Sequence, residues 1–152
     1  MPLSVVLIYS VVFCVPCLTY NVSYTDCGST GIFVVSVDIE PCSHEPCTLI
    51  KGRSASVRIK FMAFETIHAG RTNVQGLYPG SIRVPLQRNG VCAQLVPSCP
   101  IVAGEVYTYF FTGMAPNSLR EGPMTIRWEL LKKIGVPFLC IEFPVEVAVA
   151  AK

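Results

Sequence analysis

Two short groupings of cysteine and histidine are the residues whose types and spacing could support chemistry. The segment Cys42-Ser-His44-Glu-Pro-Cys47 places a histidine between two cysteines, but no second ligand pair follows at the spacing of a zinc site. Cys14 and Cys17 form a C-x-x-C of the redox type, yet they lie in an apolar leader without a βαβ context. We therefore expect a disulfide loop at the first grouping, and neither a metal nor a cofactor.

Nucleophilic catalysis finds no support in the sequence. Only two histidines, His44 and His68, are available as bases, and an activated serine or cysteine needs a base that a third group orients. A nucleophile elbow, a phosphate-cradling glycine loop and an HExxH motif are all missing from the sequence. Asp38 and Glu40 lie two residues apart on a predicted strand, where we expect both to be solvated. The protein is therefore predicted not to be an enzyme.

Composition narrows the class of protein further. The chain has 152 residues, of which 51% are hydrophobic and 14% charged, with a net charge of +2. A nucleic-acid binder or a disordered tail would carry more charge. The first charged side chain is Asp26, and before it residues 5–15 form an apolar run ended by Pro16, shorter than the roughly 20 residues of a membrane span. We predict a signal peptide over residues 1–19 and one soluble, secreted or luminal domain over residues 20–152.

Cysteine usage agrees with an oxidising compartment, because eight cysteines are many for a cytosolic chain. Six of them follow the predicted signal peptide, and an even number in a secreted chain indicates three disulfides. The sequence alone does not choose among the many pairings. Chain proximity favours two short loops and would leave one long link: Cys42–Cys47, Cys92–Cys99 and Cys27–Cys140. Asn21-Val-Ser is a sequon near the predicted new terminus, so Asn21 is a candidate glycosylation site.

Hydrophobic periodicity predicts strands throughout the remaining chain. Apolar and polar residues alternate over 54–61, 124–130 and 139–149, which indicates strands with one buried face. Residues 32–39 are rich in β-branched side chains, residues 72–78 and 82–86 are weaker candidates, and residues 106–111 are so apolar that we expect cover on both faces. With glycine and proline turns between them, seven to eight strands predict an all-β, antiparallel sandwich. The excess of bulky apolar residues fits either a filled core or an apolar cavity between the sheets.

The segments around the six cysteines, together with two strand motifs, resemble the Niemann–Pick type C2-like branch of the ML (MD-2-related lipid-recognition) family, over about residues 24–149. The segments that carry the resemblance are Asp26-Cys27-Gly28-Ser29, Pro41-Cys42-x4-Cys47 with Leu49-Ile50-Lys51-Gly52, Cys92-x6-Cys99-Pro100-Ile101, Tyr107-x-Tyr109, Trp128-Glu129-Leu130, and Cys140 with Glu142-x-Pro144-Val145.

This resemblance implies an immunoglobulin-like sandwich whose sheets separate to admit one lipid, with a sterol entering tail-first and its hydroxyl near the mouth. It implies the disulfide pairing given above, and it places Lys51 at a position linked to sterol handling at membranes. The implied pocket wall comprises Ile39, Val57, Ile59, Phe61, Tyr109, Met124, Ile126, Trp128, Ile141 and Phe143. The implied mouth comprises Ile82, Val84, Ala115 and Leu119.

Some positions depart from the sterol carriers. Those proteins have aromatic residues where this chain has Val84 and Leu119, and a second tryptophan as the counterpart of Ile141. Smaller side chains imply a wider or more adaptable pocket and a less strict preference for sterols. Exposed cations are expected near the mouth, where they could touch an anionic membrane: Arg83, Arg88, Arg120, Lys132 and Lys133.

The resemblance therefore implies a secreted or lysosomal protein that carries a cholesterol-like sterol between membranes or proteins. It would act as a monomer, with transient contacts to membrane and to a membrane acceptor or receptor. One alternative is a broad-specificity extracellular carrier of fatty acids or semiochemicals, which would tolerate many ligands. The other is a lipid-sensing accessory protein of a receptor in innate immunity, which would form a stable complex with that receptor.

Overall fold

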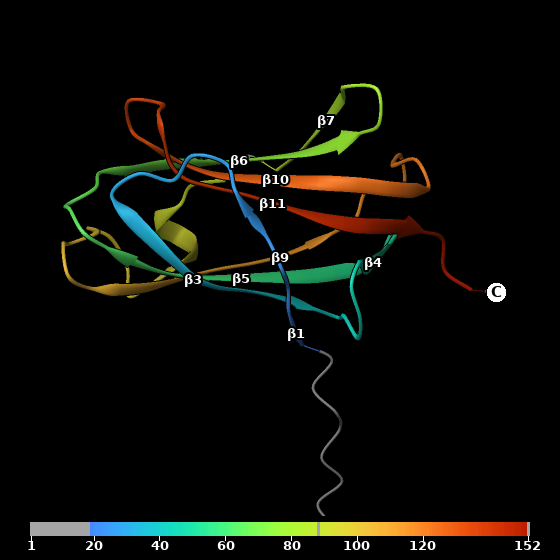
Figure 1. The fold of residues 1–152 in the computed structure, drawn as a ribbon, viewed down its shortest axis with the longest axis horizontal. Coiled ribbons are helices and arrows are strands. Elements are labelled where there is room, and N and C mark those ends of the chain that lie inside the picture. The colour runs from blue at the N-terminus through green and yellow to red at the C-terminus, as the bar shows by residue number, and fades with distance from the viewer. Residues whose placement is uncertain (1–18, 88, 152) are drawn as a thin grey trace, which may run out of the picture.

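Two β-sheets packed face to face make up the fold of this computed structural model, which describes residues 19–87 and 89–151 (Figure 1). Cys14, Cys17, Arg88 and all but the last residue of the predicted signal peptide lie outside the described residues. The sheets are named here after their central strands, the β5 sheet and the β10 sheet.

The β5 sheet forms the lower layer in Figure 1, and its neighbouring strands are antiparallel. Its strand order is β1 (Tyr20–Asn21), β3 (Ile32–Glu40), β5 (Ser54–Ala63), β9 (Val106–Met114) and β8 (Leu95–Val96). A three-residue 3₁₀ helix, η1 (Cys92–Gln94), precedes β8.

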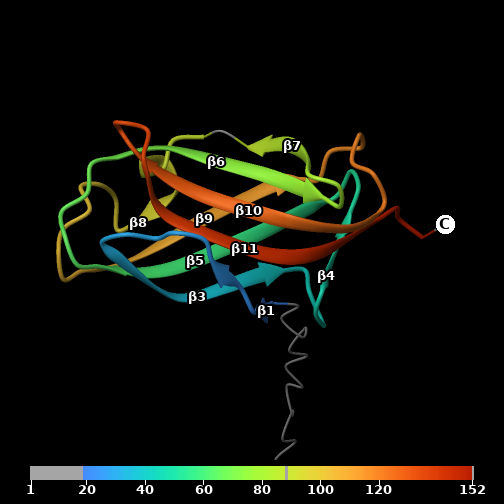
Figure 2. The ribbon, with the colours of Figure 1, turned by 45° about the horizontal axis from the view of Figure 1, so that its top comes forward.

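The β10 sheet forms the upper layer. Its strand order is β2 (Thr25–Asp26), β11 (Pro137–Ala148), β10 (Gly122–Lys132), β6 (Ala69–Tyr78) and β7 (Ile82–Gln87). A further strand, β4 (Cys47–Ile50), pairs with β11 in parallel. Figure 2 shows β7 at the margin of this sheet beside β6, and β4 at the end where the C-terminus leaves.

The predicted all-β sandwich is confirmed, and each predicted strand lies on an observed one: β3, β5, β6, β7, β9, β10 and β11. Three of the remaining strands span only two residues, which is too short for a periodic pattern. The expectation that residues 106–111 are covered on both faces is wrong. Val106 and Phe110 are 43% and 40% exposed, because they project from the outer face of the β5 sheet, while Tyr107 and Tyr109 point inward.

The core lies between the sheets and follows the alternation in the sequence. On β5, Val57, Ile59 and Phe61 are buried, whereas Arg58 and Lys60 are exposed. The inward row of β10 is likewise apolar, and the two rows face each other across the sandwich. Burying these side chains supplies the main drive for folding, because each removes apolar area from water.

Three disulfides join the pairs that chain proximity favours: Cys27–Cys140, Cys42–Cys47 and Cys92–Cys99. Cys42 follows β3 of one sheet and Cys47 begins β4 of the other, so this bond ties the two sheets together on the β3 side. Among the described residues, no disulfide joins β7 to β9. Within the described part of the chain, a disulfide therefore cross-links the two sheets on the β3 side and none does so on the β7 side.

Within residues 19–87 and 89–151, no helix is long and apolar enough to cross a membrane. The same residues contain no group of three or more His, Cys, Asp or Glu side chains arranged to hold a metal ion.

Candidate functional site

An apolar cavity of about 130 Å³ lies between the sheets. It occupies the end of the sandwich where the β4–β5 turn meets the β9–β10 loop. Five strands from both sheets, β4 and that loop supply its lining, which consists of Leu49, Ala55, Val57, Val74, Leu86, Phe111, Gly113, Met114, Ala115, Pro116, Leu119, Ile126 and Trp128.

The β4–β5 turn holds the β9–β10 loop over this end of the cavity. The Gly52 N–H donates a hydrogen bond to the Ala115 carbonyl at 2.8 Å, and the Lys51 ammonium donates to the Leu119 carbonyl at 2.9 Å. Gly52 has φ of 78°, and a Cβ there would come within 2.9 Å of Asn117 Oδ1. The left-handed backbone at this turn therefore favours glycine, whereas the Asn117 side chain can move away from an added Cβ.

The depth of the cavity follows from strand register. Val57 on β5 pairs with Phe111 on β9, and Val74 on β6 pairs with Trp128 on β10. These four side chains line the cavity from opposite sheets, and we call them the cavity layer.

A second layer lies two residues away on each of these strands, deeper in the sandwich, where Ile59 pairs with Tyr109 and Thr72 pairs with Leu130. All four side chains are fully buried and none of them lines the cavity. We call them the floor layer, because the cavity ends where they begin.

The floor layer contains a polar contact between the sheets. The hydroxyl groups of Thr72 and Tyr109 lie 3.1 Å apart and share a hydrogen bond. The indole of Trp128 lies edge-on to the Tyr109 ring, with 5.9 Å between centroids, and its Nε1 is buried without a hydrogen-bond partner among the described residues. Burial raises the pKa of Tyr109, and the nearby Thr72 hydroxyl and Trp128 N–H oppose that rise only in part. The Tyr109 hydroxyl is therefore neutral at physiological pH and remains a hydrogen-bond donor.

The structure divides the predicted pocket residues into groups. Val57, Ala115, Leu119, Ile126 and Trp128 line the cavity, and Ile59 and Tyr109 belong to the floor layer. The other predicted wall residues are buried in the core but do not line the cavity: Ile39, Phe61, Met124, Ile141 and Phe143. On β7, Val84 is half-buried and Ile82 is 49% exposed, and neither lines the cavity.

Other lining residues were not predicted from the sequence. Ala55 and Phe111 lie two positions from Val57 and Tyr109, so strand alternation could have identified them. Leu49 lies on β4, for which the sequence has no periodic signal. The rest are Val74, Leu86, Gly113, Met114 and Pro116.

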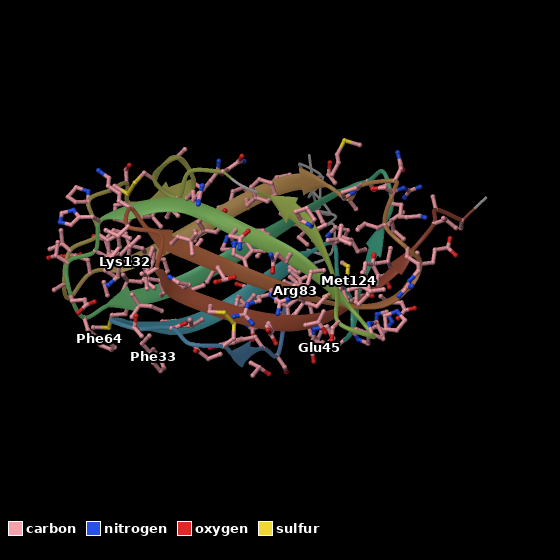
Figure 3. All side chains as sticks on the ribbon, turned by 90° about the horizontal axis from the view of Figure 1, so that it is seen from above. Phe33, Glu45, Phe64, Arg83, Met124 and Lys132 are labelled. Atoms are coloured by element: carbon pink, nitrogen blue, oxygen red, sulfur yellow. A yellow bond between two sulfur atoms is a disulfide. The ribbon has the colours of Figure 1, made fainter. Side chains whose placement is uncertain are left out.

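The predicted cations do not all lie near the cavity. In Figure 3, Arg83 lies beside Met124 in one half of the molecule, whereas Lys132 lies with Phe64 toward the end of the other half. The expectation that Lys132 and its neighbour Lys133 lie near the mouth is therefore wrong, because both follow the far end of β10, beyond the floor layer.

Arg120 lies in the β9–β10 loop and is exposed, with its guanidinium 4.8 Å from the centre of the Tyr78 ring. The candidate glycosylation residue Asn21 is also exposed. It lies on β1, and its Nδ2 donates to Asp38 Oδ1 at 3.1 Å.

The cavity is smaller than a typical ligand-binding pocket. Small-molecule pockets commonly measure roughly 300–1,000 Å³, so a cavity of about 130 Å³ must enlarge before it can enclose a whole lipid. A larger hollow of about 360 Å³ at the ends of β6 and β10 includes the carboxylates Glu142 and Glu146, which suit an apolar ligand less well. The cavity between the sheets remains the better candidate site.

Comparisons with known proteins agree with this architecture. The family model described as ML domain matches residues 21–147. The NPC intracellular cholesterol transporter 2 of Danio rerio is 32% identical over 127 residues, covering 83% of this chain and 85% of that protein. Its homolog a from Drosophila melanogaster is 29% identical over 145 residues, covering 91% and 97%.

Among solved structures, a Niemann-Pick type C2 protein from the Japanese carpenter ant superposes with a TM-score of 0.72 at 20% identity, covering 84% of this chain and 100% of that chain. That likeness supports the fold. The ML domain model matches most of this chain, and one relative is more than 30% identical to it. The chain therefore belongs to the ML domain family, as a Niemann–Pick type C2-like member.

Proposed function

We propose that this protein binds a sterol or a similar small lipid between its sheets and carries it between membranes or proteins. The observation that carries the proposal is an apolar cavity between the sheets of an ML-domain chain, in a family whose members include proteins named as cholesterol transporters. Lipid surface buried there would contribute roughly 25 cal/mol per Å², before the cost of association. A secreted or lysosomal setting, removal of residues 1–19 and transient contact with membranes are part of the same proposal.

Like these transporters, the chain is not an enzyme, so the site has only to bind and release its ligand. A lipid would first meet the cavity lining and would widen the cavity by parting the side chains of the two sheets. Deeper entry would bring the ligand against the remaining predicted wall residues: Ile39, Phe61, Met124, Ile141 and Phe143. This order explains how residues can be wall positions of an occupied pocket and core positions of a closed one.

The proposal is tested by titrating purified, delipidated protein with cholesterol. Trp128 is the single tryptophan of the chain and lines the cavity, so its selectively excited fluorescence reports on the site. We expect saturation at one sterol per chain. Ala55→Phe places a ring in the cavity and should weaken binding by on the order of tenfold.

The matched control is Ala103→Phe, which adds the same ring at an exposed residue of the loop before β9. It should leave sterol affinity unchanged. Equal affinity in both variants would place the sterol elsewhere and contradict the proposal. Binding of fatty acids without any sterol competition would favour the broad-specificity carrier, and binding of neither lipid, with a stable receptor complex, would favour the accessory protein.

A further inference from the structure

The interior of the sandwich carries one polar cluster where apolar packing would be expected. Thr72 is the one fully buried residue of the polar or charged classes among those described. It meets the Tyr109 hydroxyl at 3.1 Å, and Trp128 lies edge-on to the same tyrosine. Thr72 and Trp128 come from the β10 sheet and Tyr109 from the β5 sheet, so the cluster spans the space that a ligand has to enter.

The cluster has more donor hydrogens than hydrogen bonds. The two hydroxyl groups and the indole supply three donor hydrogens, whereas the described residues show one hydrogen bond among them. The indole Nε1–H is the one buried side-chain polar group without a partner among the described residues, and one of the two hydroxyl hydrogens is not used within the cluster. A buried polar group without a partner is destabilising and is uncommon in folded proteins, so this excess calls for a physical explanation.

The position of the cluster relative to the cavity supplies that explanation. Tyr109 and Thr72 belong to the floor layer, and Trp128 belongs to the cavity layer directly next to it. Tyr109 lies six residues before Ala115, a cavity-lining residue at the start of the β9–β10 loop, and six residues span about 20 Å at the rise of a β-strand. That depth is comparable with the length of a sterol, so the inner end of such a ligand would arrive at the cluster.

Resting on the proposed function, we propose that Tyr109, Thr72 and Trp128 bind a neutral oxygen atom at the inner end of the lipid. An alcohol or carbonyl oxygen accepts hydrogen bonds from the two unused donors. An ionised carboxylate is disfavoured, because the eight residues of the cavity and floor layers include no Lys, Arg or His and a buried charge needs a counter-charge. The ligand class is a lipid with oxygen at the end that enters first, such as a sterol hydroxylated on its side chain.

The test compares cholesterol with 25-hydroxycholesterol, in wild type and in the double variant Tyr109→Phe/Thr72→Val. Trp128 is retained, so its fluorescence reports each titration. The ratio of the two affinities within one protein includes the different water solubilities of the sterols, and comparing that ratio between two proteins cancels this difference. We expect the preference for the hydroxylated sterol to fall by about tenfold in the double variant, the effect of a lost hydrogen bond in an apolar site.

A matched control removes one tyrosine hydroxyl and one threonine hydroxyl at positions away from the cavity. Tyr24 donates to the Val34 carbonyl at 3.2 Å, and Thr112 bonds Ser56 on the outer face of the β5 sheet. Tyr24→Phe/Thr112→Val should keep the wild-type preference. If the floor double variant does not fold, Thr72→Val alone, which preserves side-chain volume, should show a smaller loss in the same direction.

Three results are distinguishable. A ratio that changes less than twofold between wild type and the floor variant overturns the oxygen-binding floor, while saturable cholesterol binding would leave the proposed function intact. Failure of wild type to bind either sterol overturns the proposed function itself. Loss of the preference in the floor variant supports the assignment. A red shift of Trp128 emission in wild type with 25-hydroxycholesterol, and not with cholesterol, supports it as well, because the indole N–H then gains an acceptor.

Discussion

Lys51 is better placed to position the mouth than to contact a membrane freely. Its ammonium donates to the Leu119 carbonyl at 2.9 Å, and its side chain is half-buried. Leu119 lines the cavity, so a single charge-assisted hydrogen bond connects the β4–β5 turn to the cavity wall. The position that the family resemblance links to sterol handling thus has a direct structural connection to the site.

Replacing Lys51 by methionine should loosen the β9–β10 loop without unfolding the protein. Since the bond is partly exposed to solvent, we expect a loss of about 1 kcal/mol in the free energy of unfolding. Bound sterol should dissociate several-fold faster, as measured by stopped-flow fluorescence of Trp128. Lys60→Met, at an exposed residue of β5, is the control, and Lys51→Arg should restore slow release. Unchanged dissociation in Lys51→Met would show that this bond does not restrain the mouth.

Among the elements, β7 and β9 form the side of the sandwich that is least secured. Among the residues that the structure describes, β7 pairs only with β6, and β8 covers β9 only at Thr108 and Tyr109. On the other side, Cys42–Cys47 ties the sheets together and β4 extends the β10 sheet. The sheets can therefore part along the β7 and β9 side while the β3 and β4 side stays joined.

Hydrogen exchange should display this asymmetry. In the unliganded protein we expect amides of residues 82–87 and 110–114 to exchange on the order of tenfold faster than those of β10, which is paired on both edges. Bound lipid should slow exchange on β7 and β9 and leave β1 and β4 unchanged. Protection of β4 and β1 with no change on β7 and β9 would mean that the sandwich opens on the opposite side.

At the scale of the whole molecule, two pairs of exposed cations lie at opposite ends of the sandwich. Arg83 lies on β7, and Arg53 lies in the turn beside the mouth, where its carbonyl accepts a hydrogen bond from the Ala115 N–H at 3.0 Å. Lys133 and Arg71 lie beyond the floor layer, around a hollow at the other end. A membrane that receives lipid from the mouth should therefore respond to the first group and not to the second.

Reversing both mouth cations, Arg53→Glu with Arg83→Glu, should slow sterol transfer to anionic vesicles by on the order of tenfold at low salt. Sterol affinity should stay unchanged, because neither side chain lines the cavity. Arg71→Glu with Lys133→Glu gives the same change in net charge at the far end and should transfer at the wild-type rate. Equal slowing in both variants would indicate that only net charge matters, and the assignment of the mouth as the membrane-facing end would be wrong.

The same scale shows what sequence patterns can and cannot predict. Alternation along β5 and β10 correctly identified the inward faces, including Val57 and Trp128, because burial of one face imposes a period of two. It did not indicate depth: Val57 and Phe61 share a face and a pattern, but only Val57 lines the cavity. Depth depends on register between strands that are distant in sequence, which no local pattern specifies.

At β9, the apolar pattern of the sequence does not predict which side chains are exposed, for a related reason. Phe110 lies under the Arg58 guanidinium, 5.5 Å from the ring centre, so an aromatic side chain can occupy an outer face without a second layer above it. The sequence shows that Phe110 is hydrophobic, but it does not show that Arg58 lies beside it on the adjacent strand.

The uncovered margin at β7 also bears on self-assembly. A strand with free backbone groups is a template on which a second chain can add, and repetition of that step builds fibrils. β7 carries Pro85 within its span, opposite Gln75, and the charged Arg83 two residues earlier. Proline offers no N–H to an incoming strand, and the charge of Arg83 opposes close stacking of identical chains. The edge strand β7, along which the sheets can part for a lipid, is therefore a poor template for another copy of the protein.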